Sequence, residues 1–305
     1  MTACACGEPA VHFARYSGEH LCAGHFRRSV EKRVKRELRK QGPFPSGSRV
    51  AVALSGGKDS VVALRLLHET FGGTRVQVVA VSIDEGIAGY RPPALDVARR
   101  HCEALGVEHL VLSYEETAGV TMDKVVAHPA RQHLPCAYCG VLRRRNLNEA
   151  AKRVGATHLA TGHNLDDYAQ SILMNHLRGD VERLARMGPH RPGKVQPGLV
   201  PRLLPLRLIP EKEVALYAIL RGFEYHDGEC PYSTEATRGR YRDLLLDLEE
   251  REPGTRHALV GGYDRLAPLL KSEATLGACA TCGEPTSGAR CRACELLGEV
   301  GGRVA

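Results

Sequence analysis

The sequence predicts an α/β protein in which a Rossmann-like parallel sheet is flanked by a zinc-binding module at each end. From Val50 to about Tyr225, short apolar runs typical of strands alternate with segments of helical periodicity, which is the pattern of βαβ units. Outside that region, cysteines gather near both termini at spacings typical of zinc ligands. Because nucleotides bind at the carboxyl ends of parallel strands, we expect a functional site at that edge of the sheet.

Composition limits the classes of protein that this chain can belong to. Its 305 residues suffice for two or three domains, and its formal net charge of +7 favours a polyanionic partner. The first 25 residues lack the apolar stretch of a signal peptide, and no apolar run is long enough to cross a membrane. We therefore expect no membrane span and a cytoplasmic location, where 11 cysteines indicate metal or redox chemistry rather than disulfides.

The first predicted module, residues 1–42, combines four soft metal ligands with a basic helix. Cys4, Cys6, Cys22 and His25 have finger-like spacing, although Cys-x-Cys is tighter than the usual Cys-x-x-Cys. Thiols in a flexible segment are the alternative to zinc. Residues 26–41 place apolar side chains at helical spacing and carry eight basic against two acidic residues, a net +6. We predict that this helix contacts an RNA backbone, and a solvated charged face is the alternative.

The βαβ region is predicted to follow a Gly- and Pro-rich linker at residues 42–47. The expected elements fall into two groups. Strands are expected at Val50–Leu54, Val76–Ile83, Glu108–Leu112 and Thr157–Thr161. Helices are expected at Ser60–Phe71, Pro92–Leu105 and Val141–Val154. Cys102, in an apolar helical stretch, is expected to be a small buried residue.

The turn after the first of these strands reads Ser55-Gly-Gly-Lys-Asp-Ser60. A strand, a glycine turn and a helix start gather backbone N–H groups around one point, which together with the helix dipole favours an anion. Lys58 adds a cation suited to a phosphate. The turn matches neither G-x-x-x-x-G-K-[ST] nor G-x-G-x-x-G. An ordinary strand-to-helix turn is the alternative.

Two further strand ends carry polar residues. Asp84 and Glu85 follow the second strand, and Gly162, Asp166 and Asp167 follow the fourth. Gly162 permits a close backbone approach. The carboxylates of Asp166 and Asp167 suit Mg²⁺, or they complement a helix dipole. We expect these groups to share one sheet edge with the glycine turn.

Three central cysteines, Cys136, Cys139 and Cys230, lack a fourth partner of the usual kind. They could include a redox pair, form an incomplete zinc site, or provide three ligands of an iron–sulfur cluster with one iron left open. The basic run at residues 143–145 follows at the predicted start of a helix. Positive charge there opposes the helix dipole, which favours an anionic ligand nearby.

The last third of the chain is predicted to contain helices and a second zinc module. Residues 173–208 suggest a helix and a long loop with six basic residues that could touch RNA: Arg178, Arg183, Arg186, Arg191, Lys194 and Arg202. Helices are expected at 211–222 and 238–250. Two Cys-x-x-Cys pairs close a structural zinc site formed by Cys279, Cys282, Cys291 and Cys294. The predicted domains are 1–42, 43–230, 231–272 and 273–305.

Several of these motifs resemble those of a known family. Ser55–Ser60 is similar to the S-G-G-x-D-S loop of the PP-loop ATP pyrophosphatases, whose members split ATP between the α and β phosphates. Together with the terminal cysteine clusters, the chain resembles the two-zinc-finger tRNA 2-thiouridine synthetases over nearly its whole length. Residues 84–91, 140–145 and 173–180 look most like the archaeal and eukaryotic cytosolic enzyme that thiolates the wobble uridine. The related enzyme that thiolates the T-loop uridine is the second-best match to these motifs.

The resemblance implies roles for individual residues. ATP would be bound by Ala53, Ser55, Gly56, Gly57, Lys58, Asp59, Ser60, Ile83, Gly162 and Asp167. Cys136, Cys139 and Cys230 would hold a [4Fe–4S] cluster, and Arg143 would supply a basic group near the nucleotide. The catalytic set would be Lys58, Asp59, Cys139, Arg143, Asp167 and Cys230. The implied partners are tRNA, a ubiquitin-like sulfur-carrier protein, and a second subunit in a homodimer or heterodimer.

The chemistry that fits these residues is activation of uracil O2 by adenylation, with Lys58, the loop amides and Mg²⁺ neutralising the departing pyrophosphate. A sulfur nucleophile then attacks C2. It could be hydrosulfide on an open iron or a persulfide on Cys139 or Cys230. Three alternatives remain: thiolation of the T-loop uridine, a PP-loop ligase or amidotransferase acting on a small molecule, and a zinc-ribbon RNA-binding protein without catalysis.

Overall fold

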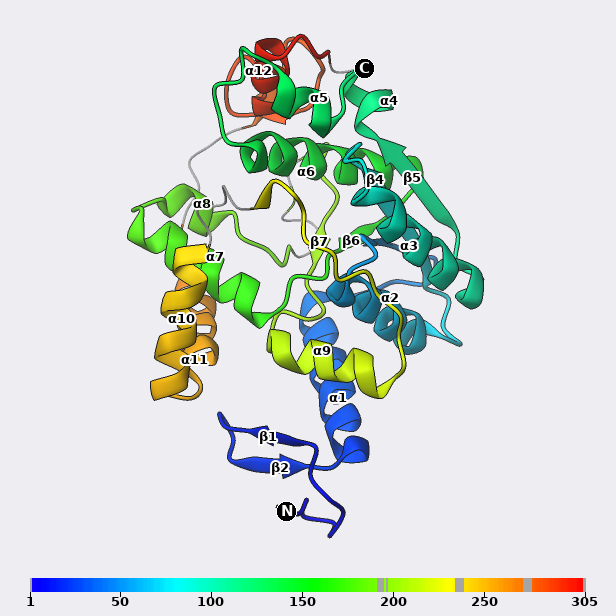
Figure 1. Cartoon of the computed structure of the whole chain (residues 1–305), viewed down its shortest axis with the longest axis vertical. Helices are drawn as coiled ribbons and strands as arrows, with labels where there is room; N and C mark the ends of the chain where they lie inside the picture. The colour runs from blue at the N-terminus through cyan, green and yellow to red at the C-terminus, as the bar shows by residue number, and fades with distance from the viewer. Residues whose placement is uncertain (1, 191–194, 196, 234–238, 271–275, 304–305) are drawn as a thin grey trace.

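The centre of the molecule is a parallel sheet in a computed structural model that describes residues 2–190, 195, 197–233, 239–270 and 276–303. The sheet has five strands in the order β5-β4-β3-β6-β7 (Figure 1). These strands are β3 (Arg49–Ala53), β4 (Gln77–Asp84), β5 (His109–Ser113), β6 (His158–Ala160) and β7 (Arg202–Leu203). The four predicted strands are confirmed within two residues. β7 was not predicted, because two residues are too few to show a period.

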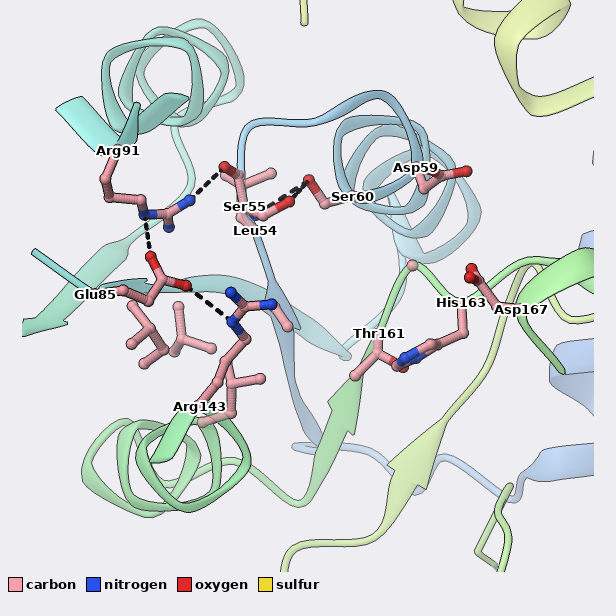
Figure 2. A pocket seen from close by; sticks show the side chains of 15 residues that line it. Leu54, Ser55, Asp59, Ser60, Glu85, Arg91, Arg143, Thr161, His163 and Asp167 are labelled. Carbon is pink, nitrogen blue, oxygen red and sulfur yellow. Dashed lines mark hydrogen bonds and ion pairs between the residues drawn. The ribbon is translucent and has the colours of Figure 1, made fainter. Parts of the chain in front are cut away.

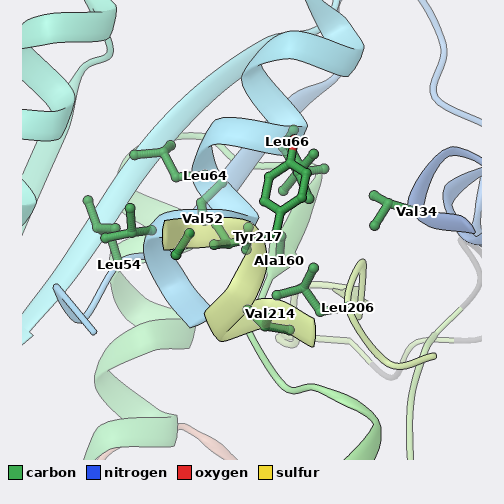
Figure 3. Packing of buried hydrophobic residues seen from close by; sticks show 14 of the residues in the cluster. Val34, Val52, Leu54, Leu64, Leu66, Ala160, Leu206, Val214 and Tyr217 are labelled. Carbon is green, nitrogen blue, oxygen red and sulfur yellow. The ribbon is translucent and has the colours of Figure 1, made fainter. Parts of the chain in front are cut away.

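Helices cover both faces of the sheet. On one face, α1 (Ala23–Gln41), α2 (Lys58–Phe71), α3 (Arg91–Leu105) and α9 (Glu211–Leu220) form one apolar core with β3. Figure 3 shows strand residues Val52 and Ala160 among Leu64, Val214 and Tyr217 of these helices. The apolar stripe predicted for residues 26–41 lies in this core, and Cys102 is buried there as predicted.

The opposite face carries α6 (Pro135–Arg153) and the C-terminal module. This second core also includes α4 (Tyr114–Ala118), α5 (Met122–Ala127) and α12 (Arg292–Glu299). α12 packs on α6 at the end of the molecule away from the N-terminus (Figure 1). The C-terminal module also contains the short hairpin of β8 (Gly277–Ala278) and β9 (Pro285–Thr286).

A third core joins the helices at the side of the sheet. It contains α7 (Leu165–Leu177), α8 (Val181–Ala185), α10 (Gly239–Arg251) and α11 (Thr255–Leu266), followed by the 3₁₀ turn η2 (Ala267–Leu269). The predicted long loop at 173–208 is therefore partly wrong, since α8 and β7 interrupt it. Two of its predicted RNA contacts, Arg191 and Lys194, lie outside the described residues.

The start of α6 corrects the sequence prediction most clearly. The helix was expected to begin at Val141 and begins at Pro135 instead. Proline has its φ preset for the first helical turn and needs no hydrogen-bond acceptor there. Cys136 and Cys139 consequently lie on the first turns of α6, and residues 143–145 lie inside the helix. The argument that these arginines oppose a helix start was wrong.

The N-terminal module is a small hairpin of β1 (His12–Ala14) and β2 (Glu19–Leu21) attached to α9 through a buried carboxylate. Glu213 accepts hydrogen bonds from His12 at 3.2 Å and Tyr16 at 2.7 Å, and pairs with Arg33 of α1. Although burial raises the pKa of Glu213, these partners lower it to about 2. The carboxylate thus joins the hairpin, α1 and α9.

A glutamine closes one edge of the central sheet. Gln41, the last residue of α1, is buried beside Leu204, which directly follows the edge strand β7. Its side-chain oxygen accepts the Leu204 N–H at 2.8 Å, and its side-chain nitrogen donates to the Leu204 carbonyl at 3.1 Å. The side chain therefore pairs with both backbone groups of that residue. Within the described part of the chain, no helix is long and apolar enough to cross a bilayer.

Candidate active site

A cavity of about 280 Å³ opens at the carboxyl ends of β3, β4 and β6, where the sequence predicted a nucleotide site. Eight predicted residues line it: Ala53, Ser55, Asp59, Ser60, Ile83, Arg143, Gly162 and Asp167. Seven others complete the lining: Leu54, Val81, Glu85, Arg91, Leu147, Thr161 and His163. Figure 2 shows polar side chains from several elements facing this space.

The turn between β3 and α2 is held open by its own hydroxyl groups. The Ser55 N–H donates to Ser60 Oγ at 3.1 Å, and Ser60 Oγ donates to the Gly57 carbonyl at 2.8 Å. Gly56 has φ of 87°, and a Cβ there would stand 2.0 Å from the backbone oxygen of Ala94. Glycine is therefore required at position 56 for both conformation and space. The result is a rigid loop whose helix begins at Lys58.

The fourth strand end touches the same loop. A Cβ at Gly162 would lie 2.9 Å from the Asp59 carbonyl carbon and the Ser60 nitrogen, which confirms the predicted close approach. Asn164 caps α7 and donates from Nδ2 to Asp59 Oδ1 at 3.0 Å. Asp167 Oδ2 in turn accepts a hydrogen bond from the Asn164 N–H at 3.2 Å. One capping box thus fixes both Asp59 and Asp167 beside the cavity.

The two acids predicted to bind Mg²⁺ have different environments. Asp167 lines the cavity, whereas Asp166 is buried, pairs with Arg256 and accepts the Glu211 N–H at 2.8 Å. The prediction for Asp166 was therefore wrong, since its oxygens face α9 and α11. Asp59 also lines the cavity, and burial raises its pKa. Asp59 and Asp167 are the carboxylates that fit a hard cation there.

Lys58, Gly56 and Gly57 form the outer part of the loop rather than the cavity lining. Lys58 Nζ lies 3.1 Å from Asp59 Oδ2 and 2.7 Å from Glu211 Oε1. Burial lowers the pKa of Lys58, but the two carboxylates raise it further, so the net shift is upward. The ammonium is therefore charged and held by Asp59 and Glu211.

A buried glutamate organises two arginines on the opposite wall (Figure 2). Glu85 Oε2 lies 3.0 Å from Arg91 Nε, and Glu85 Oε1 lies 2.9 Å from Arg143 Nε. Arg91 also donates to the Ser55 carbonyl at 2.8 Å, and Arg143 donates to Cys139 Sγ at 3.1 Å. The sequence did not distinguish Glu85 from Asp84, which instead accepts the Gly86 N–H at 2.8 Å. Alternation along β4 was the available signal, since Ile83 and Glu85 face one side.

The central cysteines lie beyond Arg143. Cys139 is half-buried, and its Sγ lies 3.8 Å from the Tyr114 hydroxyl group, while Cys136 Sγ lies 3.9 Å from the Tyr232 carbonyl oxygen. Tyr232 is two residues beyond Cys230, which packs at the margin of the same core as Cys139. Among the described residues, these thiols do not form a group with the close spacing of a single-ion site. Each thiolate of a [4Fe–4S] cluster binds a different iron, so cluster ligands lie farther apart than the ligands of one ion. The three soft thiols, their wider spacing, and the hydrogen bonds that Tyr114 and Arg143 donate to Cys139 therefore fit a cluster.

The two terminal groups have the spacing of single-ion sites. Within each, all ligand atoms lie within 4.8 Å of one another: Cys4, Cys6, Cys22 and His25 in one, and Cys279, Cys282, Cys291 and Cys294 in the other. The Cys6–Cys22 and Cys279–Cys294 sulfur pairs are 3.8 Å apart. Tetrahedral zinc with Zn–S bonds of about 2.3 Å places sulfurs about 3.8 Å apart. Backbone N–H groups lower the pKa of Cys4 and Cys279 to about 6, which favours the metal-binding thiolates.

Comparison with known proteins agrees with this fold and site. Residues 26–249 match the PP-loop domain, and residues 4–27 match the 2-thiouridine synthetase TtuA N-terminal LIM domain. The PP-loop match, which covers most of the chain, defines the class of protein. The chain is 44% identical to tRNA 2-thiolation protein NcsA of Haloferax volcanii, over 96% of this chain and 97% of that protein. It is 43% identical to cytoplasmic tRNA 2-thiolation protein 1 of Bos taurus, over 92% and 82%.

A solved structure gives the same assignment. The U34-tRNA thiolase NcsA from Methanococcus maripaludis, with its [4Fe-4S] cluster, superposes with a TM-score of 0.85 at 34% identity, covering 97% of this chain and 95% of that chain. The chain therefore belongs to the PP-loop family, in the group of the tRNA 2-thiolation proteins.

Proposed function

We propose that this protein is an ATP-dependent tRNA sulfurtransferase that converts a uridine to 2-thiouridine, and that its target is the wobble uridine. The observation that carries the proposal is the chain of contacts from Ser55 through Arg91, Glu85 and Arg143 to Cys139, which joins a PP-loop cavity to the central cysteines. The names of the relatives support tRNA as the substrate, and the M. maripaludis protein supports U34 as the position.

In the first step, uracil O2 attacks the α-phosphorus of ATP, and pyrophosphate leaves. The loop amides of residues 55–60 and the Lys58 ammonium stabilise the negative charge on the departing group. To do so, Lys58 exchanges its contact with Glu211 for a phosphate oxygen. Asp59 and Asp167 would hold Mg²⁺, which neutralises the phosphate charge when bound.

In the second step, a sulfur nucleophile attacks C2 of the adenylated uridine, and AMP leaves with the original O2. Cys136, Cys139 and Cys230 would hold a [4Fe–4S] cluster, which supplies an open iron for an inorganic sulfide when bound. Arg143 fixes the orientation of Cys139 through its 3.1 Å hydrogen bond and is itself held by Glu85. In the alternative route, the outer sulfur of a persulfide on Cys139 or Cys230 attacks C2 and AMP leaves. The thiol of the other cysteine then attacks the sulfur of the first, which releases 2-thiouridine and leaves a disulfide between the two cysteines.

The remaining assignments complete this proposal. Both terminal groups would hold structural zinc, since four protein ligands close a tetrahedral shell. A ubiquitin-like sulfur-carrier protein would deliver the sulfur. The location of the protein would be cytoplasmic. The domain boundaries at 42, 230 and 272, and the RNA contact of α1, stay predictions. T-loop thiolation, a small-molecule ligase and a non-catalytic RNA-binding protein remain the alternatives.

The experiment is anaerobic incubation of the protein with ATP, sulfide and an unmodified tRNA transcript, followed by nucleoside mass spectrometry. We expect 2-thiouridine and one AMP per sulfur. A matched transcript with cytidine at the wobble position separates the two uridine positions, because it is thiolated only by a T-loop enzyme. No thiolated nucleoside with either transcript, under conditions where the protein retains iron and zinc, would contradict the proposal.

A further inference from the structure

A second cavity adjoins the ATP cavity and has no role in the proposed reaction so far. It measures about 580 Å³ and shares Thr161, His163 and Asp167 with the ATP cavity. Its walls come from α6, α7, α8 and β7. Four arginines line it, Arg144, Arg183, Arg186 and Arg202, and we call it the arginine cavity. Asp167, at the junction with the ATP cavity, is the carboxylate among its lining residues.

Two of these arginines have neither a counter-ion nor a hydrogen-bond acceptor in the described part of the chain. Arg183 pairs with Asp180 at 3.1 Å, and Arg186 donates to the Glu182 carbonyl at 3.1 Å. No described carboxylate or hydrogen-bond acceptor contacts the guanidinium group of Arg144 or Arg202. Burial and the neighbouring charges of Arg202 and Arg183 lower the pKa of Arg144, and burial lowers that of Arg202. Two adjacent cations without counter-ions are unfavourable until an anion binds.

The same two arginines also line a third cavity, of about 460 Å³, that continues toward the C-terminal zinc module. Its lining includes Arg144, Arg186 and Arg202 together with three residues of the C-terminal module, Pro285, Cys291 and Arg292. The three cavities therefore lie next to one another, from the ATP site past Arg144 and Arg202 to the C-terminal module. A row of cavities with cations along it matches an extended polyanion better than a single small anion.

We propose that Arg144 and Arg202 bind the backbone phosphates that flank the target uridine, with the arginine cavity receiving that nucleotide beside ATP. The inference rests on the proposed function and adds the RNA-binding groups of the same site. Arginine suits this role because its planar guanidinium binds phosphate oxygens in pairs. The shared residues Thr161 and His163 place the base end of such a nucleotide next to the ATP cavity.

Pyrophosphate leaving the ATP cavity is the other source of phosphate oxygens. The length of this row of cavities favours RNA, since Arg144 and Arg202 line both the arginine cavity and the cavity at the zinc module. Pyrophosphate needs only one exit from the ATP cavity, whereas the RNA chain extends from the reacting uridine toward both its 5′ and its 3′ side. The test therefore measures both ligands.

The experiment uses the full-length, metal-loaded protein and the variants Arg144→Gln and Arg202→Gln, with Arg153→Gln as the matched control. Arg153 is an exposed arginine on the same helix, paired with Glu149 at 2.9 Å and outside these cavities. Binding of an unmodified tRNA transcript is followed by fluorescence anisotropy at several salt concentrations. Inorganic pyrophosphate binding is measured by calorimetry.

We expect each cavity variant to weaken tRNA binding about tenfold, as loss of a charged hydrogen bond does. We also expect the slope of log Kd against log salt to fall by about 0.7 for each arginine. Arg153→Gln should alter neither quantity, and all melting temperatures should stay close to that of the wild type. Unchanged tRNA affinity and salt slope in both variants would overturn the assignment, as would weaker pyrophosphate binding with unchanged tRNA binding. If the wild-type protein binds no tRNA, the proposed function fails instead.

Discussion

The terminal and central cysteine groups use the same side chain in two different ways. Each terminal group collects four ligand atoms within 4.8 Å from one short segment, and the group closes on itself. The central group combines two thiols on the first turns of α6 with Cys230, which is far along the chain and packs at the margin of the same core as Cys139. A closed group has no position left for a substrate. Under the proposed function, the central group with three protein ligands would leave one iron open for a substrate. Placement and ligand number would then distinguish a structural metal site from a chemical one.

The largest effect should come from Cys139→Ala. Loss of this thiolate would remove a proposed cluster ligand and removes the partner of Arg143, so we expect thiolation to fall by about 100-fold or more. Iron content should fall while zinc stays at two equivalents. Nucleoside mass spectrometry and metal quantification on anaerobic protein measure these quantities. Cys102→Ala, a buried cysteine outside all three groups, is the control and should keep both metals. Full activity of Cys139→Ala would remove the distinction between the groups.

The reverse pattern is expected for Cys279→Ala. The C-terminal module should lose one zinc equivalent and its packing on α6, with iron retained. We expect the melting temperature to fall by about 5 °C or more, since about 1 kcal/mol corresponds to 2–4 °C in a protein of this size. Calorimetry and zinc quantification test this. An unchanged melting temperature would show that this group does not stabilise the fold.

A third variant, Glu213→Gln, tests the attachment of the N-terminal module. The pKa of Glu213 falls from its ordinary 4.5 to about 2, which corresponds to about 3 kcal/mol of stability. Because the folded-state pKa is lowered, this contribution is present above pH 4.5 and is lost as the pH falls toward 2. Wild type and variant should therefore differ in denaturant unfolding at pH 7 and converge in acid. Glu250→Gln, an exposed partner of Arg15, is the control. A difference that does not depend on pH would contradict the assignment.

The smallest effect concerns Lys58. Glu211 competes with phosphate for its ammonium group, so Glu211→Gln should lower the KM for ATP about threefold. Steady-state kinetics at saturating tRNA measure this change. Glu224→Gln, which removes an exposed carboxylate paired with Arg100, should leave the KM unchanged. A raised KM would mean that Glu211 assists ATP binding instead of competing with it.

Local pattern was enough to predict much of this molecule. The four longer strands, the glycine turn and both terminal ligand groups depend on residues that are near one another in sequence. Gly162 could be predicted as a close approach because it follows a buried strand. The ends of buried strands are visible in the sequence, so the side of the ATP cavity formed by the glycine turn and Gly162 could be predicted. The wall formed by Glu85 and Arg91 could not.

The failures all depend on contacts between distant segments. Asp166 was predicted to be a metal ligand, but the structure pairs it with Arg256 of α11. The contact of Lys58 with Glu211 was not predictable from the sequence, because the two residues are far apart along the chain. Glu85 is indistinguishable from Asp84 in sequence, and the pleat of β4 decides which one faces the cavity. The start of α6 was missed because a Cys-x-x-Cys motif suggests a loop, whereas Pro135 begins a helix.

The contact between Gln41 and Leu204 has a consequence for solubility. The edge of a sheet is a template on which a strand of another molecule can add, and such addition starts many aggregates. Beside β7, the carboxamide of Gln41 already holds the N–H and carbonyl groups that an incoming strand would need at Leu204. A single side chain at the end of α1 thereby acts as a cap against intermolecular strand growth at this edge.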